Sequence, residues 1–110
     1  MRRLRSQEEI KDLSRFLGYG TARIRLQKYG ITPEEALDLL SLQGSRCAIC
    51  NCLLDPEDGD WNNRPQLDHD HETNAVRGWL CTLCNRGIGY FKDKPELLRK
   101  ALEYLERSQS

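Results

Sequence analysis

The sequence has 110 residues, of which 31% are charged and 38% hydrophobic, and its 17 basic side chains balance its 17 acidic ones. A chain this short is expected to form one domain, with at most a small helical appendage. It has no apolar run near the ~20 residues of a membrane-spanning helix, and its basic first residues lack the apolar core of a signal peptide, so we expect a cytoplasmic protein with no membrane contact.

Charge is unevenly distributed along the chain, although the total is zero. Residues 1–30 carry eight basic and three acidic side chains, a net charge of +5, and the remaining residues therefore carry −5. A basic segment of this kind is suited to neutralising phosphates, although a merely solvated helix face is an equally good interpretation. We divide the chain into a basic helical N-terminal extension, residues 1–30, and a main domain, residues 31–110.

Helix signals are clearest in the first half of the chain. Residues 6–17 combine a capping box with apolar side chains at helical spacing, and residues 21–29 form a shorter second helix closed by Gly30. Thr32, followed directly by a proline and two glutamates, predicts the start of a third helix, which Gly44 ends.

The second half of the chain predicts a β-hairpin followed by helices. Residues 65–71 and 75–80 look like its two arms, with residues 72–74 at the bend. From Cys84 the chain is expected to enter a helix, and Pro95 opens the last one. The apolar side chains of that last helix form one stripe: Leu97, Leu98, Ala101, Leu102 and Leu105.

Four of the five cysteines form two C-x-x-C pairs, Cys47 with Cys50 and Cys81 with Cys84. Two such pairs facing each other make a tetrahedral thiolate cage, so the spacing predicts a structural zinc ion. An odd cysteine count without a secretory signal disfavours disulfides, and the lack of β-α-β alternation disfavours a redox pair, which leaves buried free thiols as the alternative. Cys52 is expected to be a free thiol, although it could replace Cys50 as a ligand.

Both histidines lie between the cysteine pairs, in the segment Asp68-His69-Asp70-His71. A zinc ion held by four cysteines needs no histidine, so these two require another explanation. An imidazole beside carboxylates offers a base that titrates near pH ~6.5 and oxygen ligands for a hard divalent cation. The alternatives are that Asp68 and Asp70 are turn residues and that His71 only bridges the hairpin.

Three segments in this order resemble the recombination endonuclease VII family of phages, which belongs to the HNH or His-Me finger nucleases. They are Cys47-x-x-Cys50, Leu67-Asp68-His69-Asp70-His71-Glu72 and Val76-Arg77-Gly78-Trp79-Leu80-Cys81-x-x-Cys84-Asn85. The resemblance covers about residues 33–106. In the family's long junction resolvase an additional acidic residue follows the asparagine, and Ile88 stands in that place here.

The resemblance implies an α+β fold, a small zinc-stapled ββα-metal domain with flanking helices, and the activity of a DNA endonuclease. It implies that His69 is the general base, that Asp68 and Asn85 bind Mg²⁺ or Mn²⁺, and that His71 supports catalysis near the phosphate. Phosphodiester hydrolysis needs these types of group, because a water must be deprotonated and the charge on the leaving oxygen neutralised.

The resemblance implies that DNA is the partner, and one competing interpretation has no catalytic activity. Arg77 and Arg86 are candidate DNA phosphate contacts, although either could pair with acids such as Glu72. The competing interpretation is a non-catalytic zinc-stabilised module that binds DNA or protein. Since junction-resolving relatives have a long helical C-terminal portion and this chain ends soon after one helix, we expect a monomer or a weak homodimer.

The proposed roles place one demand on the backbone. In a regular strand Asp68 and His69 point to opposite faces of the sheet. For both to serve one phosphate, the strand must end or be distorted at this point.

Overall fold

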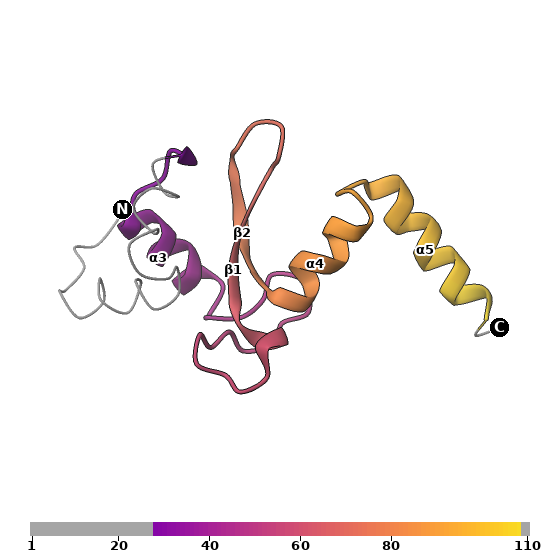
Figure 1. Ribbon diagram of the computed structural model, residues 1–110, viewed down its shortest axis with the longest axis horizontal. Coiled ribbons are helices and arrows are strands. Elements are labelled where there is room, and N and C mark those ends of the chain that lie inside the picture. The colour runs from indigo at the N-terminus through magenta and orange to yellow at the C-terminus, as the bar shows by residue number, and fades with distance from the viewer. Residues whose placement is uncertain (1–27, 109–110) are drawn as a thin grey trace.

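The structure is a computed structural model that describes residues 28–108 (Figure 1). The helix predicted at residues 6–17 and nearly all of the one at 21–29 lie outside this range. The described residues form a small α+β fold around one two-stranded sheet. In chain order the elements are α3 (Pro33–Leu42), the short 3-10 helix η1 (Trp61–Asn63), β1 (Pro65–His69), β2 (Val76–Cys81), α4 (Thr82–Tyr90) and α5 (Pro95–Arg107).

Helix α3 begins and ends where the sequence predicts. The Thr32 hydroxyl accepts a hydrogen bond from the Glu35 N–H at 3.1 Å, and the Glu35 carboxylate accepts one from the Thr32 N–H at 2.9 Å. This reciprocal capping box satisfies two amides that the first turn leaves without helical partners. The chain leaves the helix through Gly44, whose φ of +63° is the left-handed conformation that a glycine adopts without steric cost.

The hairpin forms as predicted, but its strands are shorter at the tip. β1 and β2 pair antiparallel, with Pro65 opposite Cys81. We expected the first arm to continue to residue 71, whereas β1 ends at His69, and His71 lies in the turn. The reason is local, because the Asp70 carboxylate accepts hydrogen bonds from the backbone N–H groups of Glu72 and Thr73, at 2.8 and 3.1 Å. These bonds turn the backbone away from the ladder.

The core lies between α3 and β2, where Trp79 is completely buried. Its indole N–H donates to the Ala36 carbonyl at 2.9 Å, so the ring packs against α3 without leaving its polar atom unsatisfied. The side chain of Gln43 joins the same two elements. Its Oε1 accepts from the Trp79 N–H and its Nε2 donates to the Trp79 carbonyl, both at 2.9 Å.

Helix α4 begins at Thr82, two residues before the start that the sequence predicts at Cys84. Both the backbone N–H and the hydroxyl of Thr82 donate to the Arg64 carbonyl at 3.0 Å, just before β1. Two contacts thus support the earlier start: a local cap, in which Cys81 Sγ accepts from the Cys84 N–H at 3.4 Å, and this contact across 18 residues, which no local helix signal reveals. The same contact fixes the first turn of α4 against the hairpin.

Helix α5 begins at Pro95 as predicted, but no residue of α5 is buried. Leu102 and Leu105 in its apolar stripe are 54% and 57% exposed. Figure 1 shows α5 extending away from the hairpin beyond α4. The helical spacing was therefore predicted correctly, while the packing that such a stripe usually indicates is not found within the described residues. None of the helices between residues 28 and 108 is long and apolar enough to cross a membrane.

Candidate functional site

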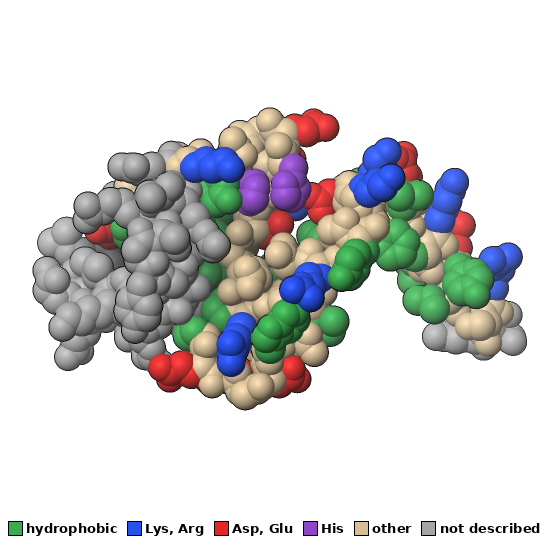
Figure 2. Space-filling view, viewed as in Figure 1, with side chains coloured by type: hydrophobic (Ala, Val, Ile, Leu, Met, Phe, Trp, Pro, Cys, Tyr) green, Lys and Arg blue, Asp and Glu red, His purple; other side chains and the backbone are tan. Residues whose placement is uncertain are grey.

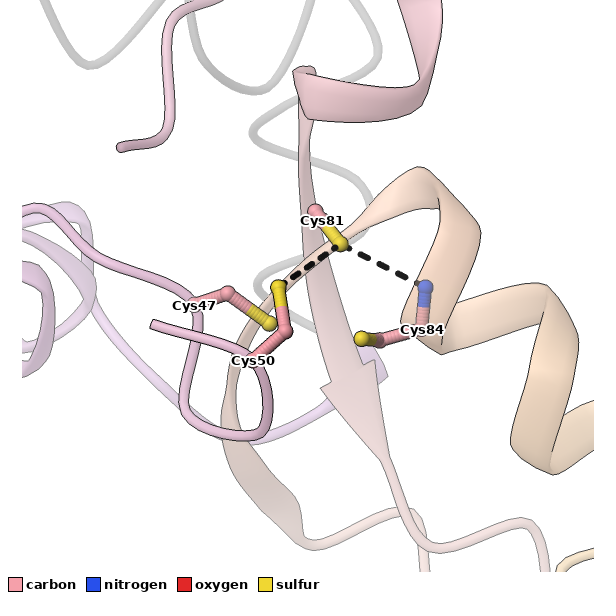
Figure 3. A group of neighbouring side chains, drawn as sticks. All are labelled: Cys47, Cys50, Cys81 and Cys84. Carbon is pink, nitrogen blue, oxygen red and sulfur yellow. Dashed lines mark hydrogen bonds between the residues drawn. The ribbon is translucent and has the colours of Figure 1, made fainter. Parts of the chain in front are cut away.

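The two cysteine pairs converge on one point (Figure 3). The sulfurs of Cys47, Cys50, Cys81 and Cys84 all lie within 4.8 Å of one another, and Cys50 Sγ is 3.7 Å from Cys81 Sγ. Sulfurs that bind a tetrahedral zinc ion at about 2.3 Å lie about 3.8 Å apart. The cluster therefore fits a structural zinc ion, as its spacing predicts.

Different parts of the fold supply these four sulfurs. Cys47 and Cys50 come from the loop after α3, Cys81 ends β2, and Cys84 lies in the first turn of α4. Backbone N–H groups donate to the first sulfur of each pair at 3.4 Å, from Ile49 to Cys47 and from Cys84 to Cys81. Although burial opposes it, such hydrogen bonds lower the pKa of Cys47 to about 6, which favours the thiolate form that binds metal.

Cys52 lies outside the set of four clustered sulfurs. It is half-buried against the core, and burial is the main cause that raises its pKa to about 12. Because Cys50, and not Cys52, clusters with the other three sulfurs, the geometry agrees with the expected free thiol and not with the alternative in which Cys52 replaces Cys50.

The hairpin is distorted where the sequence analysis requires it to be. Asp68 pairs with Gly78, but the next residue, His69, pairs with Val76, so Arg77 has no partner in the ladder. This bulge breaks the alternation of side chains in β2 and shifts the pairing register between Asp68 and His69 of β1. The expectation that the strand ends or is distorted between Asp68 and His69 is confirmed.

Arg77, the extra residue of the bulge, is held by two carboxylates. Its Nε and Nη2 donate to the two oxygens of Asp68 at 2.7 and 3.0 Å, and Nη2 also lies 3.3 Å from Asp93 Oδ2. The hydrogen bond with Asp68 is the largest cause of the raised Arg77 pKa. The sequence suggested Glu72 as an acidic partner, but within the described residues the partners are Asp68 and Asp93.

The two histidine rings lie together beside this bulge. The His69 ring stacks on the Tyr29 ring with centroids 4.3 Å apart, and the centroids of the His69 and His71 rings are 4.6 Å apart. Burial and the neighbouring His71 lower the pKa of His69, so the neutral imidazole, which can accept a proton, predominates at neutral pH. Figure 2 shows both rings on a face that also carries Lys and Arg side chains.

Asp93 is a residue of this site that the sequence analysis missed. Its Oδ2 lies 3.5 Å from His71 Nε2 as well as 3.3 Å from Arg77 Nη2. Lys92 and Asp93 adopt consecutive left-handed conformations, with φ of 57° and 56°, each of which costs about 1–2 kcal/mol in a residue with a side chain. The only local signal is that aspartate tolerates this conformation better than most residues, and nothing in the sequence connects it with His71.

Asn85 lies on α4 between two cavities. One, of about 420 Å³, is lined by His71, Asn85, Arg86, Gly89, Tyr90 and Asp93. The other, of about 300 Å³, is lined by Trp61, Arg64, Gln66, Thr82, Asn85 and Arg86. The structure thus brings Asn85 and His71 to one hollow, while Asp68, His69 and His71 are connected through Arg77, Asp93 and ring contacts.

Comparisons with known proteins match most of this chain. The family model of recombination endonuclease VII matches residues 22–107. The Gene 59 protein of Mycobacterium phage D29 is 42% identical over 83 residues, which are 74% of this chain and 47% of that protein. The Gene 59 protein of Mycobacterium phage L5 is 41% identical over 81 residues, 73% of this chain and 46% of that protein.

The chain spans about half the length of these two phage relatives. No solved structure matches it. The family match, in contrast, covers most of the chain and includes both cysteine pairs, the two histidines and Asn85. The chain is therefore a member of the recombination endonuclease VII family.

Proposed function

We propose that the protein is a metal-dependent DNA endonuclease that hydrolyses phosphodiester bonds with His69 as general base. Residues 31–110 would form the nuclease domain, of the ββα-metal (HNH or His-Me finger) type, and residues 1–30 a basic extension. The observation that carries the proposal is the bulge between Asp68 and His69, beside which both histidines come together. Family membership supports a nuclease in general, and this geometry supports the residue roles.

His69 is suited to accept a proton from the attacking water. Stacking on Tyr29 at 4.3 Å restrains the ring, and the lowered pKa keeps the imidazole neutral. A positioned histidine of this kind contributes a factor of about 10²–10⁴ to hydrolysis. His71, which is exposed and lies 3.5 Å from Asp93, would support the phosphate next to that base.

Asp68 and Asn85 would hold a catalytic Mg²⁺ or Mn²⁺. Their carboxylate and amide oxygens are the donors that these ions prefer. Both oxygens of Asp68 accept hydrogen bonds from Arg77, but each has a further lone pair, so the donor set fits a cation while Arg77 fixes the carboxylate plane. When bound, the ion supplies positive charge that stabilises the transition state and the leaving oxygen.

The cysteine cluster would act structurally. A zinc ion held by Cys47, Cys50, Cys81 and Cys84 connects the loop after α3 with the end of β2 and the start of α4. Asn85 directly follows Cys84, so the zinc would fix the position of Asn85 relative to the hairpin. The zinc-stapled arrangement thereby positions groups that it does not itself contact.

The test is cleavage of supercoiled plasmid in the presence of Mg²⁺ or Mn²⁺. We expect nicking by the wild-type protein and a loss of at least about 100-fold in His69→Ala, because the general base is removed. Cys52→Ser is the matched control, since Cys52 lies outside both the cysteine cluster and the histidine site, and it should cleave like the wild type. DNA binding without cleavage across metals and pH would overturn the proposal and indicate a zinc-stabilised binding module.

A further inference from the structure

The cavities near the histidine site differ in charge. One, of about 620 Å³, is lined by three acidic and three basic residues in addition to His71, Gly89 and Pro95: Asp70, Glu72, Asp93, Arg77, Lys92 and Lys94. The cavity on the other side of Asn85 contains Arg64 and Arg86, and no carboxylate is among the described residues that line it. Of the two, this cavity has the charge that attracts a phosphate backbone.

This basic cavity adjoins the histidine site. Asn85 and Arg86 line both this cavity and the one that contains His71. The two cavities are therefore neighbours on either side of Asn85 and Arg86. We call the surface formed by Trp61, Arg64 and Arg86 the Trp61 groove.

Arg86 is preorganised within this groove. Its guanidinium carbon lies 4.1 Å from the centroid of the Trp61 ring, and Trp61 itself is 42% exposed. Stacking uses the face of the guanidinium and leaves its N–H donors at the edge available. An arginine fixed in this way loses less conformational freedom when it binds a phosphate.

Arg64 is fixed from the other side of the groove. Its Nε donates to the Asp58 carbonyl at 3.1 Å, and its own carbonyl accepts from the first turn of α4, at Thr82. The side chain is exposed, so its remaining N–H donors face solvent. Backbone contacts thus hold Arg64 beside the helix that carries Arg86.

We infer that the Trp61 groove binds the DNA phosphates next to the scissile one, with Trp61 holding Arg86 flat as a phosphate contact. The inference rests on the proposed function for the position of the scissile phosphate at His69. The groove itself is argued from its charge, its position beside Asn85 and the stacked arginine. It also predicts which way the substrate strand leaves the site, toward Arg64 and not toward Lys92 and Lys94.

Affinity is the first measurement, made with the full zinc-loaded chain and a labelled DNA duplex in buffer without Mg²⁺ or Mn²⁺. Arg64→Ala and Arg86→Ala should each weaken binding about fivefold near 0.1 M salt, because each removes one phosphate contact. Each should also reduce the slope of log affinity against log salt by about 0.7–0.9. Lys100→Ala removes the same charge from α5, outside the groove, and should change neither value.

Trp61 provides the second measurement. In a double-mutant cycle, Trp61→Ala and Arg86→Ala should be strongly non-additive, because both remove the same preorganised contact. Trp61→Phe should recover part of the affinity, since a smaller aromatic face still supports the guanidinium. The control is Tyr104→Ala, which removes an exposed aromatic residue whose ring also lies under an arginine, Arg107, at 5.5 Å.

Tryptophan fluorescence gives an independent signal. The chain has two tryptophans, and Trp79 is completely buried, so a change on adding DNA should come from Trp61 and be absent in Trp61→Phe. Unchanged affinity and salt slope in the groove variants, or no DNA binding by the wild type, would overturn the inference. If the groove variants cleave and bind DNA like the wild type, the groove is refuted and the nuclease is not. If the groove variants bind DNA more weakly but the wild type does not cleave it, the groove is supported and the nuclease is refuted.

Discussion

The Asp93 carboxylate is shared by two side chains of the candidate site that come from the hairpin, Arg77 and His71. Arg77 in turn holds both oxygens of Asp68, which we propose as a metal ligand. Asp93 therefore shares the Arg77 Nη2 donor with Asp68 and also holds His71. Two consecutive left-handed residues bring it there, and strain of this kind is often kept at functional sites.

We expect Asp93→Asn to lower plasmid cleavage by about tenfold, the size of effect typical of residues that orient metal ligands. Asparagine keeps the shape and tolerates the left-handed conformation, but it loses the charge that attracts Arg77 and His71. Cleavage rates measured at increasing Mg²⁺ concentrations would show whether the apparent metal affinity changes. A purely structural defect would lower the cleavage rate at every Mg²⁺ concentration without changing the apparent metal affinity.

The neighbouring residue supplies the control for this experiment. Lys92 has nearly the same φ as Asp93 and lies in the same turn, so Lys92→Asn changes the backbone preference without removing a carboxylate. Its cleavage and metal dependence should match the wild type. Equal effects of the two substitutions would mean that the turn, and not the Asp93 charge, matters.

At the scale of elements, one side chain joins α3 to the hairpin. Gln43, the residue at the C-terminal cap of α3, bonds both the N–H and the carbonyl of Trp79, and its Nε2 also donates to the Arg46 carbonyl at 2.8 Å. Gly78 makes the close approach possible, because a Cβ at that position would lie 3.1 Å from Gln43 Oε1. Gln43 thus acts as a bridge between the helix and β2.

Replacing this bridge should destabilise the fold. Gln43→Ala removes two hydrogen bonds to the Trp79 backbone, so we expect the free energy of unfolding to fall by about 1–3 kcal/mol. Urea unfolding of the zinc-loaded protein measures it. Gln66→Ala, which removes one side-chain hydrogen bond with Thr82 at 3.2 Å, is the matched control and should cost about 1 kcal/mol or less. Similar losses in both would contradict the bridging role.

At the scale of the whole molecule, the cysteine cluster connects the loop after α3 with the end of β2 and the start of α4. Within residues 28–108 the buried core contains eight hydrophobic residues, which is a small core for a segment of this length. Two of these eight residues, Cys47 and Cys81, are themselves proposed zinc ligands. A zinc ion would therefore contribute a large part of the folding free energy, of the order of ~10 kcal/mol.

We expect the protein to contain one zinc ion per chain and to lose its fold when the metal is removed. Chelation or Cys84→Ser should abolish the thermal unfolding transition seen by circular dichroism, because the four-sulfur cage is incomplete. Cys52→Ser should keep both the zinc, measured by elemental analysis, and the transition. A protein that stays folded without zinc, or a Cys52→Ser variant without zinc, would contradict the assignment of ligands.

Features set by neighbouring residues could be predicted from the sequence. The capping box at Thr32, the turn through Gly44 and the convergence of two C-x-x-C pairs all follow from spacing and local hydrogen bonding. The need for a distortion between Asp68 and His69 also followed, because alternation along a strand is a local rule. The sequence alone thus determined the cysteine cluster, the hairpin and the family.

Only the tertiary structure decided how these parts meet. The first turn of α4 is held by the Arg64 carbonyl, Asp93 contacts His71, and Arg86 stacks on a ring from η1. It also showed that the apolar stripe of α5 is exposed within the described chain. Each of these contacts, and the exposure of α5, depends on how distant segments pack, and periodicity or capping in one segment carries no information about its distant neighbours.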